Sequence, residues 1–488
     1  MKRLFNYRLL LFLSVALCAG VATGATLYHS LLLSILIPTA SVAVGICLYF
    51  LTKKHTAWML FLFFSVGIAL FVVDNAVMKP AFSGERTVVM KVEQVKEADG
   101  KIVLSSDEFR GDAVFYRKSA ALKEGDVVLV TGNFKKVGFS YTDGYMRYLY
   151  SQRISYLIDV KEVTLRKSVP SFFEKIRSKA RGVMLRYMSD EDAAFCMSLI
   201  FGDKSTLSSD VQETMSAAGL SHVLAVSGLH VGFLTAVIVF LLKKVRVGRY
   251  PRLFITTGLL LLYGLFTGFP PGVKRSVIVY VVYALAPLLR RKQDKLTTLA
   301  AAVMLIVLGD PRELFDAGFL MSAGAVLGIL SFYRPLYRIV ARRVRNKPVL
   351  YLYGIVCATL SSNVFVLPIA LSSFSSVALY SVLGNLAILP IVSVVFPCLA
   401  VASFLCVAYS GFGVLFYVIK YPIIAIRIIS SMISSLPAAQ IPSAALGISC
   451  LTYILFFVCL SRFAKIKAKY KAPVCGAFAV CTVLLLAL

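Results

Sequence analysis

The sequence predicts a polytopic α-helical membrane protein with about 12–13 spans and one inserted small β-barrel outside the membrane. Hydrophobic residues make up 59% of the 488 residues and charged residues only 16%, whereas about 25% of a typical soluble domain is charged. Apolar runs that could cross a hydrocarbon layer of about 30 Å recur from Leu9 to Leu488. Residues 74–194 differ, because they hold 17 of the 24 acidic and 21 of the 52 basic residues. This composition excludes a soluble enzyme and favours a membrane protein with one water-exposed insertion.

Residues 1–73 form the expected N-terminal membrane domain, with apolar runs at 8–27, 31–51 and 56–73. The first 24 residues resemble a signal peptide, but two further apolar runs follow directly, so we expect a retained helix. Cytoplasmic loops are enriched in Lys and Arg. The basic residues that flank the first two runs are Lys2, Arg3, Arg8, Lys53 and Lys54. They place the N-terminus in the cytoplasm and residues 74–220 on the extracytoplasmic side.

Residues 74–168 predict a small barrel of the OB type. Val88, Met90 and Val92 alternate with other residues in a period of two, which is typical of a strand. Further short runs of this kind are separated by turns that contain glycine, at 101–104, 113–116, 126–131 and 154–160. Five short strands suit a small closed barrel.

Aromatic and basic residues are interleaved in this outer domain. OB folds hold single-stranded nucleic acid by stacking bases on aromatic rings in a basic groove. The alternative is that the aromatic side chains only fill the barrel. The candidate contact residues are Tyr116, Arg117, Lys118, Phe134, Lys135, Lys136, Tyr145, Arg147 and Tyr148.

Residues 169–219 predict three short helices between the barrel and the membrane core, the first of them amphipathic and flat on the membrane surface. Capping pairs and terminal glycines mark their ends: Ser171 with Glu174, Ser189 with Asp192 and Gly202, and Ser209 with Gln212 and Gly219.

Residues 220–436 predict the main membrane core and residues 437–488 two C-terminal membrane helices. The apolar runs are 221–242, 253–268, 273–289, 296–309, 314–333, 349–370, 377–410, 412–435, 444–461 and 473–488. The run at 377–410, interrupted by Pro390 and Pro397, has room for one pass and a re-entrant piece. Basic clusters at 243–252, 290–295, 334–347 and 462–471 fall on one side, in agreement with the N-terminal orientation.

The segment AGLSHVLAVSGLHVG, from Ala218 to Gly232, places polar groups in an apolar run. Such groups usually face a bundle interior or an aqueous path, because exposure to lipid is costly. The candidates for a polar path are Ser221, His222, Ser227, Gly228, His230, Lys274, Arg275 and Asn385. Interhelical packing, snorkelling to headgroups and satisfaction of a helix break are the alternatives. A Ser227–His230 nucleophile pair is also conceivable, but no acidic residue that could orient the histidine lies nearby in sequence.

Four motifs resemble those of the ComEC family of competence proteins, in the same order and spacing. They are AGLSHVLAVSGLHVG, TGFPPGVKRS from Thr267, DPRELFDAGFLMSAGAVLGI from Asp310 and GNLAILPIV from Gly384. The outer segments LKEGDVVLVTGNF and GYMRYLYSQRISY are similar to the family's OB-like domain, and the resemblance covers about residues 85 to 435.

The resemblance implies a channel subunit of the bacterial cytoplasmic membrane, which translocates single-stranded DNA into the cytoplasm during natural transformation. The implied partners are single-stranded DNA, membrane lipid, a separate nuclease, an extracytoplasmic DNA-binding protein and a cytoplasmic motor or single-strand-binding protein. The oligomeric state is left open. A transporter or membrane scaffold on this fold that does not conduct DNA is the alternative.

Two departures from the family pattern qualify this expectation. Ser276 stands where members usually have Ala, and the family's C-terminal metallo-β-lactamase-like domain has an HxHxDH motif, whereas this chain has four histidines, at 29, 55, 222 and 230. We therefore expect a form without that domain and without nuclease chemistry. The ten cysteines lie almost wholly in apolar runs, and no GxxxxGK[ST] motif occurs. We thus expect no metal, no cofactor and no nucleotide hydrolysis, so that a partner or an ion gradient supplies the energy.

Overall fold

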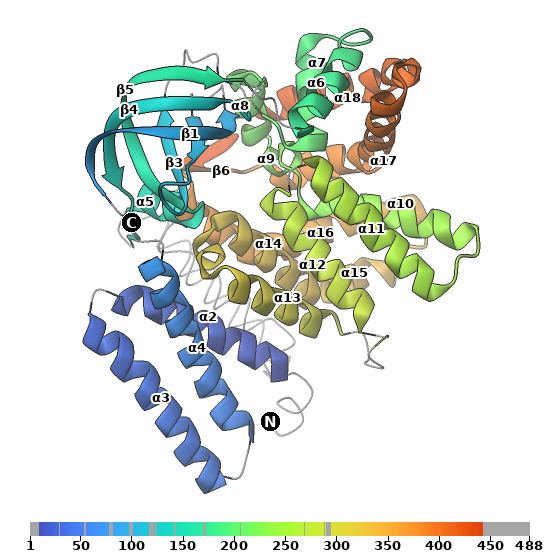
Figure 1. The fold of residues 1–488 in the computed structure, drawn as a ribbon. Helices are drawn as coiled ribbons and strands as arrows, with labels where there is room; N and C mark the ends of the chain where they lie inside the picture. Colours follow the sequence, from blue (N-terminus) through green and yellow to red (C-terminus); the bar gives the residue numbers. More distant parts are fainter. Residues whose placement is uncertain are drawn as a thin grey trace. The chain divides into compact units, whose positions relative to one another are not determined.

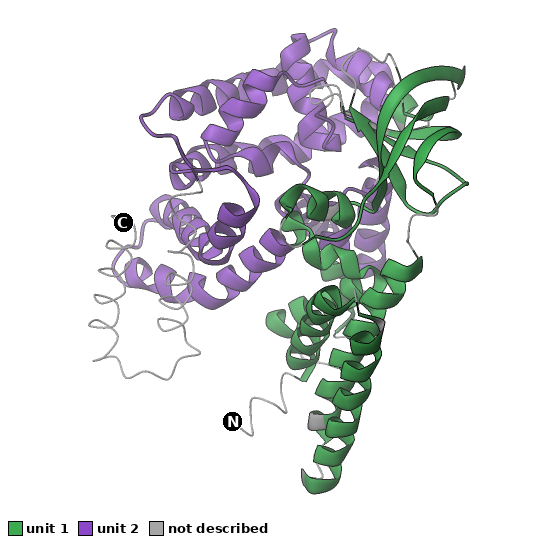
Figure 2. Ribbon diagram, turned by 90° about the vertical axis from the view of Figure 1, so that its left-hand side faces the viewer, with its two compact units in different colours: residues 1–175, 278–319 green, residues 176–277, 320–488 purple. Residues whose placement is uncertain are grey.

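The computed structural model in Figure 1 describes residues 9–28, 30–52, 55–77, 82–96, 101–116, 122, 124–140, 143–168, 172–204, 206–267, 269–286, 288 and 294–442. The two spans expected after residue 443 lie outside the described residues, as do Ser171, Arg117 and Lys118. The chain divides into two compact units (Figure 2), residues 1–175 with 278–319 and residues 176–277 with 320–488.

Seven helices of the described part are long and apolar enough to cross a membrane, which confirms a multispanning helical protein. Their apolar segments are Leu9–Leu27, Leu32–Leu51, Trp58–Val77, Ala317–Ala341, Lys347–Ser373, Ser381–Val407 and Ser410–Ser434. Four further helices fall on other apolar runs: α10 (Gly228–Lys244), α11 (Arg249–Thr267), α12 (Pro271–Leu285) and α13 (Lys295–Gly309).

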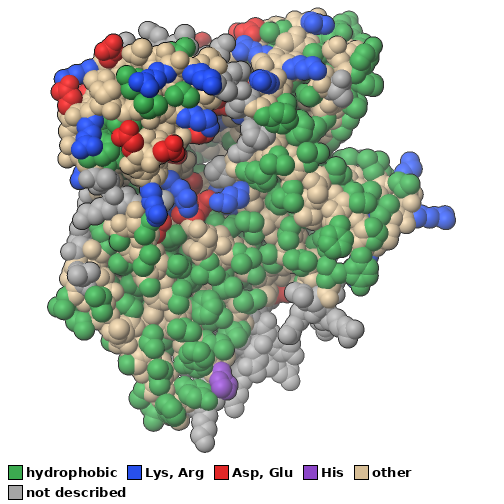
Figure 3. Space-filling model, in the orientation of Figure 1, with side chains coloured by type: hydrophobic (Ala, Val, Ile, Leu, Met, Phe, Trp, Pro, Cys, Tyr) green, Lys and Arg blue, Asp and Glu red, His purple; other side chains and the backbone are tan. Residues whose placement is uncertain are grey.

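The N-terminal helices of the first unit are α2 (Leu9–Leu27), α3 (Leu31–Thr52) and α4 (His55–Val77). Glycines let α2 and α4 approach closely: a Cβ on Gly20 would lie 2.0 Å from the Phe64 carbonyl oxygen, and one on Gly67 2.3 Å from that of Leu17. Small residues at such contacts are typical of helix pairs in membranes. Figure 3 shows mainly apolar side chains over these helices, and charged ones over the barrel strands.

The expected OB-like barrel is confirmed. Its strands are β1 (Gly84–Lys96), β2 (Lys101–Ser105), β3 (Asp112–Tyr116), β4 (Val127–Lys136) and β5 (Ile154–Lys167), and they close in the order β1-β2-β3-β5-β4. The β3–β5 pair is parallel and the other pairs are antiparallel. Side chains of alternate residues, such as Val88, Met90 and Val92, fill the interior. Helix α5 (Gly144–Ser151) packs on the outer face through Leu149, against Val114 and Ile154.

The three short helices after the barrel are α6 (Phe172–Met184), α7 (Asp190–Phe201) and α8 (Ser209–Ala217). Ser189 caps α7 as expected, because its Oγ accepts from the Asp192 N–H at 3.2 Å. Gly202 ends α7 in the left-handed conformation, with φ 70°. The cap of α8 lies one residue before the expected Ser209, since the Oγ of Ser208 accepts from the Val211 N–H.

The stretch 377–410 has no re-entrant piece. Ser376–Ala378 is a short strand, β6, which pairs with β7 (Gln440–Pro442). One helix, α17 (Ser381–Ala408), then runs through both Pro390 and Pro397. Prolines are tolerated in membrane helices because neighbouring groups satisfy the freed backbone. The Pro390 carbonyl, for example, accepts from the Ser393 hydroxyl at 2.7 Å.

Candidate functional site

The polar motif interrupts the expected span at 221–242. A single turn, α9 (Ser221–Leu224), is followed by extended backbone at Ala225 and Ser227, and α10 begins at Gly228. The expectation of one helix through this motif is therefore wrong. The main-chain N–H of Ser227 donates to Nδ1 of His230 at 3.0 Å, and the Ser227 Oγ lies 3.2 Å from the same nitrogen. This geometry is a helix cap, which accounts for the serine–histidine spacing without a nucleophile.

His230 is buried in the bundle, while His222 and Ser221 on α9 are exposed. Because a main-chain N–H donates to Nδ1, that nitrogen is the acceptor and the ring proton is on Nε2. The ring lies 4.6 Å from that of Phe396 and beside the Ala225 backbone. Within the described part of the chain, Nε2 makes no hydrogen bond of ordinary geometry. The motif thus buries one polar imidazole and exposes the other.

The helix break meets the start of α12. A Cβ on Gly272 would lie 2.4 Å from the Val226 carbonyl oxygen, and one on Gly228 would lie 2.9 Å from the Ser276 Oγ. Lys274, exposed, and Arg275, half-buried, follow on the same helix turn. Two segments that are about 45 residues apart in sequence are therefore in backbone contact, and they bring two cationic residues near the break.

Asn385 lies at a different level of the bundle. Its Nδ2 donates to the Thr359 Oγ1 at 3.3 Å, across to α16 (Lys347–Ser373), and Asn363 makes the same kind of bond to Ser381 at 3.4 Å. Phe396, which contacts His230, is eleven residues farther along α17, or about 16 Å of helix. Asn385 and His230 therefore do not lie together.

The three candidate tyrosines come together on the outside of the barrel. The Tyr145 hydroxyl donates to that of Tyr116 at 2.8 Å, and the Lys101 Nζ donates to the Tyr148 hydroxyl at 3.2 Å. Each tyrosine is more than 40% exposed. We call Lys101, Tyr116, Tyr145 and Tyr148 the tyrosine surface. Lys101 was not expected from the sequence, although it directly follows an Asp-Gly pair in the sequence and pairs with Tyr116 in the β2–β3 register.

Phe134 does not belong to this surface, which corrects the expectation for that residue. It is fully buried in the barrel core, 5.4 Å from the ring of Phe82 and 5.7 Å from that of Tyr156. Stacking on a base would require the barrel to open.

The basic candidates that the structure describes have different surroundings. Lys135 and Lys136 are exposed at the end of β4, and Arg147 is half-buried on α5. Lys135 pairs with Leu157, which pairs with Val114 on β3, two residues before Tyr116. Side chains two residues apart share a face of a strand, so Lys135 lies on the outward face two strands from Tyr116.

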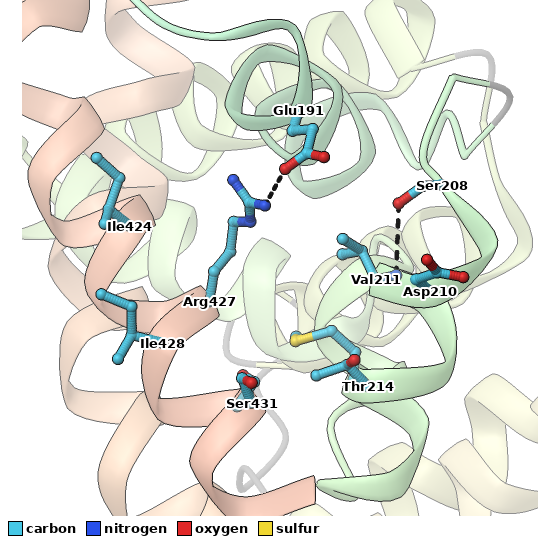
Figure 4. Close-up of a pocket in the computed structure, with 11 residues that line it drawn as sticks. Glu191, Ser208, Asp210, Val211, Thr214, Ile424, Arg427, Ile428 and Ser431 are labelled. Atoms are coloured by element: carbon cyan, nitrogen blue, oxygen red, sulfur yellow. Dashed lines mark hydrogen bonds and ion pairs between the residues drawn. The ribbon is translucent and has the colours of Figure 1, made fainter. Parts of the chain in front are cut away.

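A cavity of about 500 Å³ lies between α8 and α18 (Val414–Ser434) in the second unit. Figure 4 shows Arg427 pointing from α18 toward Glu191, with which it forms an ion pair. A second bond joins Arg427 to Asp192 at 2.6 Å. Because two carboxylates neutralise this arginine within an apolar helix, its arrangement is explained by stability alone. Among the described residues, no group of three or more His, Cys, Asp or Glu could hold a metal ion.

A model of the family described as "Competence protein" matches residues 199–466. The chain is 24% identical to ComE operon protein 3 of Bacillus subtilis over 434 residues, which cover 84% of this chain and 54% of that protein. It is 24% identical to Recombination protein 2 of Haemophilus influenzae over 232 residues, 45% of this chain and 28% of that protein. An uncharacterized protein of Aquifex aeolicus is 28% identical over 178 residues, 36% of this chain and 40% of its own. The chain thus spans about half or less of the length of these relatives, and no solved structure matches it.

Proposed function

The chain belongs to the Competence protein family, whose model matches more than half of it, and from this premise we propose that it is a channel subunit for DNA uptake. It passes single-stranded DNA through the cytoplasmic membrane into the cytoplasm. The proposal assigns no catalytic step to this chain, so the complementary strand is removed by a separate nuclease. A DNA-binding protein outside and a motor or single-strand-binding protein inside complete the route.

The observation that carries the proposal is the tyrosine surface. Tyr116 on β3 and Tyr145 and Tyr148 on α5 are exposed around the buried Lys101. The filled barrel core does not require these exposed rings, whereas stacked bases need such a platform. Residues 74–194 carry 21 basic and 17 acidic residues, so their net positive charge is small. Stacking therefore has to supply much of the affinity, at about 1–3 kcal/mol per base. Lys135 and Lys136 on β4 supply contacts to phosphates.

We further propose that the strand enters the membrane domain at the helix break. Ser221 and His222 are exposed before it, Ser227 and Gly228 form it, and His230 holds its geometry. Lys274 and Arg275 beside it attract phosphate groups. Asn385, at its own level of the bundle, keeps a polar contact between α16 and α17. The N-terminus is cytoplasmic and residues 74–220 are extracytoplasmic in this arrangement.

Entry of labelled DNA into the cytoplasm of a strain that lacks this protein tests the proposal. Wild-type protein should restore entry, and the double variant Tyr116→Ala/Tyr148→Ala should restore less than about a tenth of it, because two stacking contacts are lost. Tyr250→Ala is the matched control, since Tyr250 is 59% exposed and belongs to α11, which is not part of the barrel domain. Unchanged entry in the deletion strain would reject a channel and leave the transporter or scaffold. Full entry with the double variant would make the barrel a structural module.

A further inference from the structure

We propose that Arg153 and Arg312 are positioning residues, which lock the strand-binding helix α5 to the ends of the membrane helices in its own unit. The inference rests on the proposed function of the tyrosine surface, because α5 carries Tyr145 and Tyr148. It adds a requirement that binding alone does not have: the bound strand must be held at a fixed place relative to the membrane helices.

The first connection is made by the turn between α5 and β5. Arg153 donates from Nε to Asp310 at 2.7 Å, and the Gln152 amide donates to Asp316 at 3.3 Å. Both acceptors flank η1 (Pro311–Phe315), the short helix that follows α13. Arg153 has a φ of 59°, which is uncommon for a residue other than glycine. Backbone strain at such a position persists only where the surroundings hold it in place.

The second connection is buried. Arg312 of η1 is 2% exposed, and its Nε donates to Asp74, near the end of α4, at 2.5 Å. Its guanidinium also lies 4.3 Å from the ring centre of Tyr150 on α5. Asp310 links the two connections. One carboxylate oxygen accepts from Arg153, and the other accepts from the main-chain N–H of Arg312 at 3.1 Å. A buried arginine needs such partners, since an unpaired charge at this place would be costly.

Aromatic rings pack around the ion pairs. Phe139 lies 4.7 Å from Phe315 of η1 and 5.3 Å from Tyr150 of α5, and Phe71 of α4 lies 5.7 Å from Phe315. All three pairs meet edge to face, the geometry that aromatic rings prefer. Charge and packing thus join α4, η1 and α5 at one point.

Helix α5 therefore has two functions on two faces. Tyr145 and Tyr148 are three residues apart and share its exposed face, whereas Tyr150 is buried toward Arg312. The helix has eight residues, too few to be stable alone. Its direction is consequently set by the barrel on one side and by the two arginines at its C-terminal end.

The tyrosine surface is formed by residues 101–148 and does not include the ion pairs. Loss of the Arg153–Asp310 ion pair should therefore leave affinity for single-stranded DNA nearly unchanged. Hand-over of the strand to the membrane helices should suffer, because small misplacements of a bound reactant have large effects on a following step.

Arg153→Gly is the decisive variant. Glycine adopts the left-handed backbone of this position readily. The Arg153 side chain is about half exposed, so its ion pair adds little to stability. The variant should therefore fold. The purified full chain should bind a labelled oligonucleotide of about 16 nucleotides with a Kd within about twofold of wild type. DNA entry into cells should fall by about tenfold or more. Arg153→Lys, which keeps the charge, is the control and should retain most of the entry.

A distance measurement gives a readout that does not depend on DNA. Spin labels at Gly144→Cys and Gly309→Cys report the place of α5 relative to the end of α13, and a Cβ at either glycine meets no neighbour closer than 4.0 Å. The ten native cysteines are replaced beforehand. The distribution should be narrow in the otherwise wild-type chain and broad with Arg153→Gly.

Each result decides a separate point. An unchanged distribution or unchanged DNA entry with Arg153→Gly would overturn the positioning role. A parallel loss of affinity would also overturn it, because the ion pairs would then shape the binding surface itself. Absence of DNA binding by the wild-type chain would instead refute the proposed function, while the spin-label distances would still report whether the arginines hold α5.

Discussion

Asp112 stands at the start of β3, where burial and the nearby Glu93 raise the pKa of its carboxyl to about 6, against the opposing effect of Arg153. A raised carboxyl pKa means that the folded state keeps the proton while the unfolded state has lost it. The contribution of Asp112 to stability is therefore most favourable below about pH 4 and declines as pH rises to about 6. At neutral pH the carboxylate destabilises the barrel.

Asp112→Asn should stabilise the protein at pH 7 by about 1–2 kcal/mol, less than the full shift would give because the carboxyl is only partly buried. Thermal unfolding of the purified chain between pH 4 and 7 measures this. The stability difference between variant and wild type should grow from pH 4 to about pH 6 and then stay nearly constant. Asp107→Asn, at an exposed turn of the same barrel, is the control. A difference that does not vary with pH would contradict the assignment.

His230→Leu should lower the amount of protein in the membrane, because the half-buried Ser227 N–H loses its acceptor, at a cost of about 1–3 kcal/mol. His230→Gln should restore it, since glutamine at this position of a capping box also accepts from the N-cap backbone. Immunoblots of membranes, together with unfolding in detergent, provide the measurement. Equal abundance of the two variants would show that the bond from the Ser227 N–H to residue 230 does not stabilise the protein.

At the scale of elements, the close contacts of the helices in the second unit depend on single glycines. A Cβ on Gly272 would meet the Val226 carbonyl oxygen at 2.4 Å, and one on Gly384 would meet that of Ala218 at 2.4 Å. Neither backbone atom can rotate away. Gly272→Ala and Gly384→Ala should therefore cost about 1–3 kcal/mol each and reduce abundance. Gly232→Ala, where a Cβ meets nothing within 4 Å, should be tolerated, and equal loss in all three would reject the packing argument.

Local signals predicted several elements correctly. The period of two in β1 and the Ser189 cap of α7 follow from neighbouring residues alone. At the start of α8 both 208 and 209 are serine, so the pattern could not decide between them. The prolines of α17 suggested an interruption, but the helix continues through both of them.

Long-range contacts were beyond the reach of the sequence. The break at residues 225–227 depends on the approach of Gly272, and the Arg153–Asp310 pair joins residues 157 positions apart. Phe134 is followed by two lysines, a pattern that also fits an exposed aromatic residue. Only the structure shows that its side chain points into the barrel core. Three residues of the tyrosine surface were candidates from the sequence, but the fourth, Lys101 on β2, was not, because its bond to Tyr148 joins residues far apart in the chain.

For the whole molecule, electrostatics predicts how DNA binding responds to salt. The net charge of the chain is +28, but residues 74–194 have nearly equal numbers of basic and acidic groups, so few phosphates are neutralised at the barrel. Affinity of the full chain for single-stranded DNA should therefore fall as salt rises, and Lys135→Ala/Lys136→Ala should make the slope of log K against log salt shallower by about 1.4, because two phosphate contacts are lost. Tyr116→Ala should weaken binding with little change in slope. A changed slope with Tyr116→Ala would contradict the assignment of base stacking to the tyrosines and of phosphate contacts to the lysines.

The last prediction concerns the orientation of the whole chain. In the first unit, Asp74 near the end of α4 bonds to Arg312 of η1, and Asp310 at the end of α13 bonds to Arg153, between α5 and β5. The end of α4 and the end of α13 therefore lie on the same side as the barrel. The basic residues at 342–347 follow one further span, Ala317–Ala341, and should therefore lie opposite, in the cytoplasm. Reporter fusions at Asp107 and Arg343 measure this: a periplasmic reporter should be active only at Asp107, and a cytoplasmic reporter only at Arg343. Activity of the same reporter at both positions would contradict the orientation and, with it, the direction of transport.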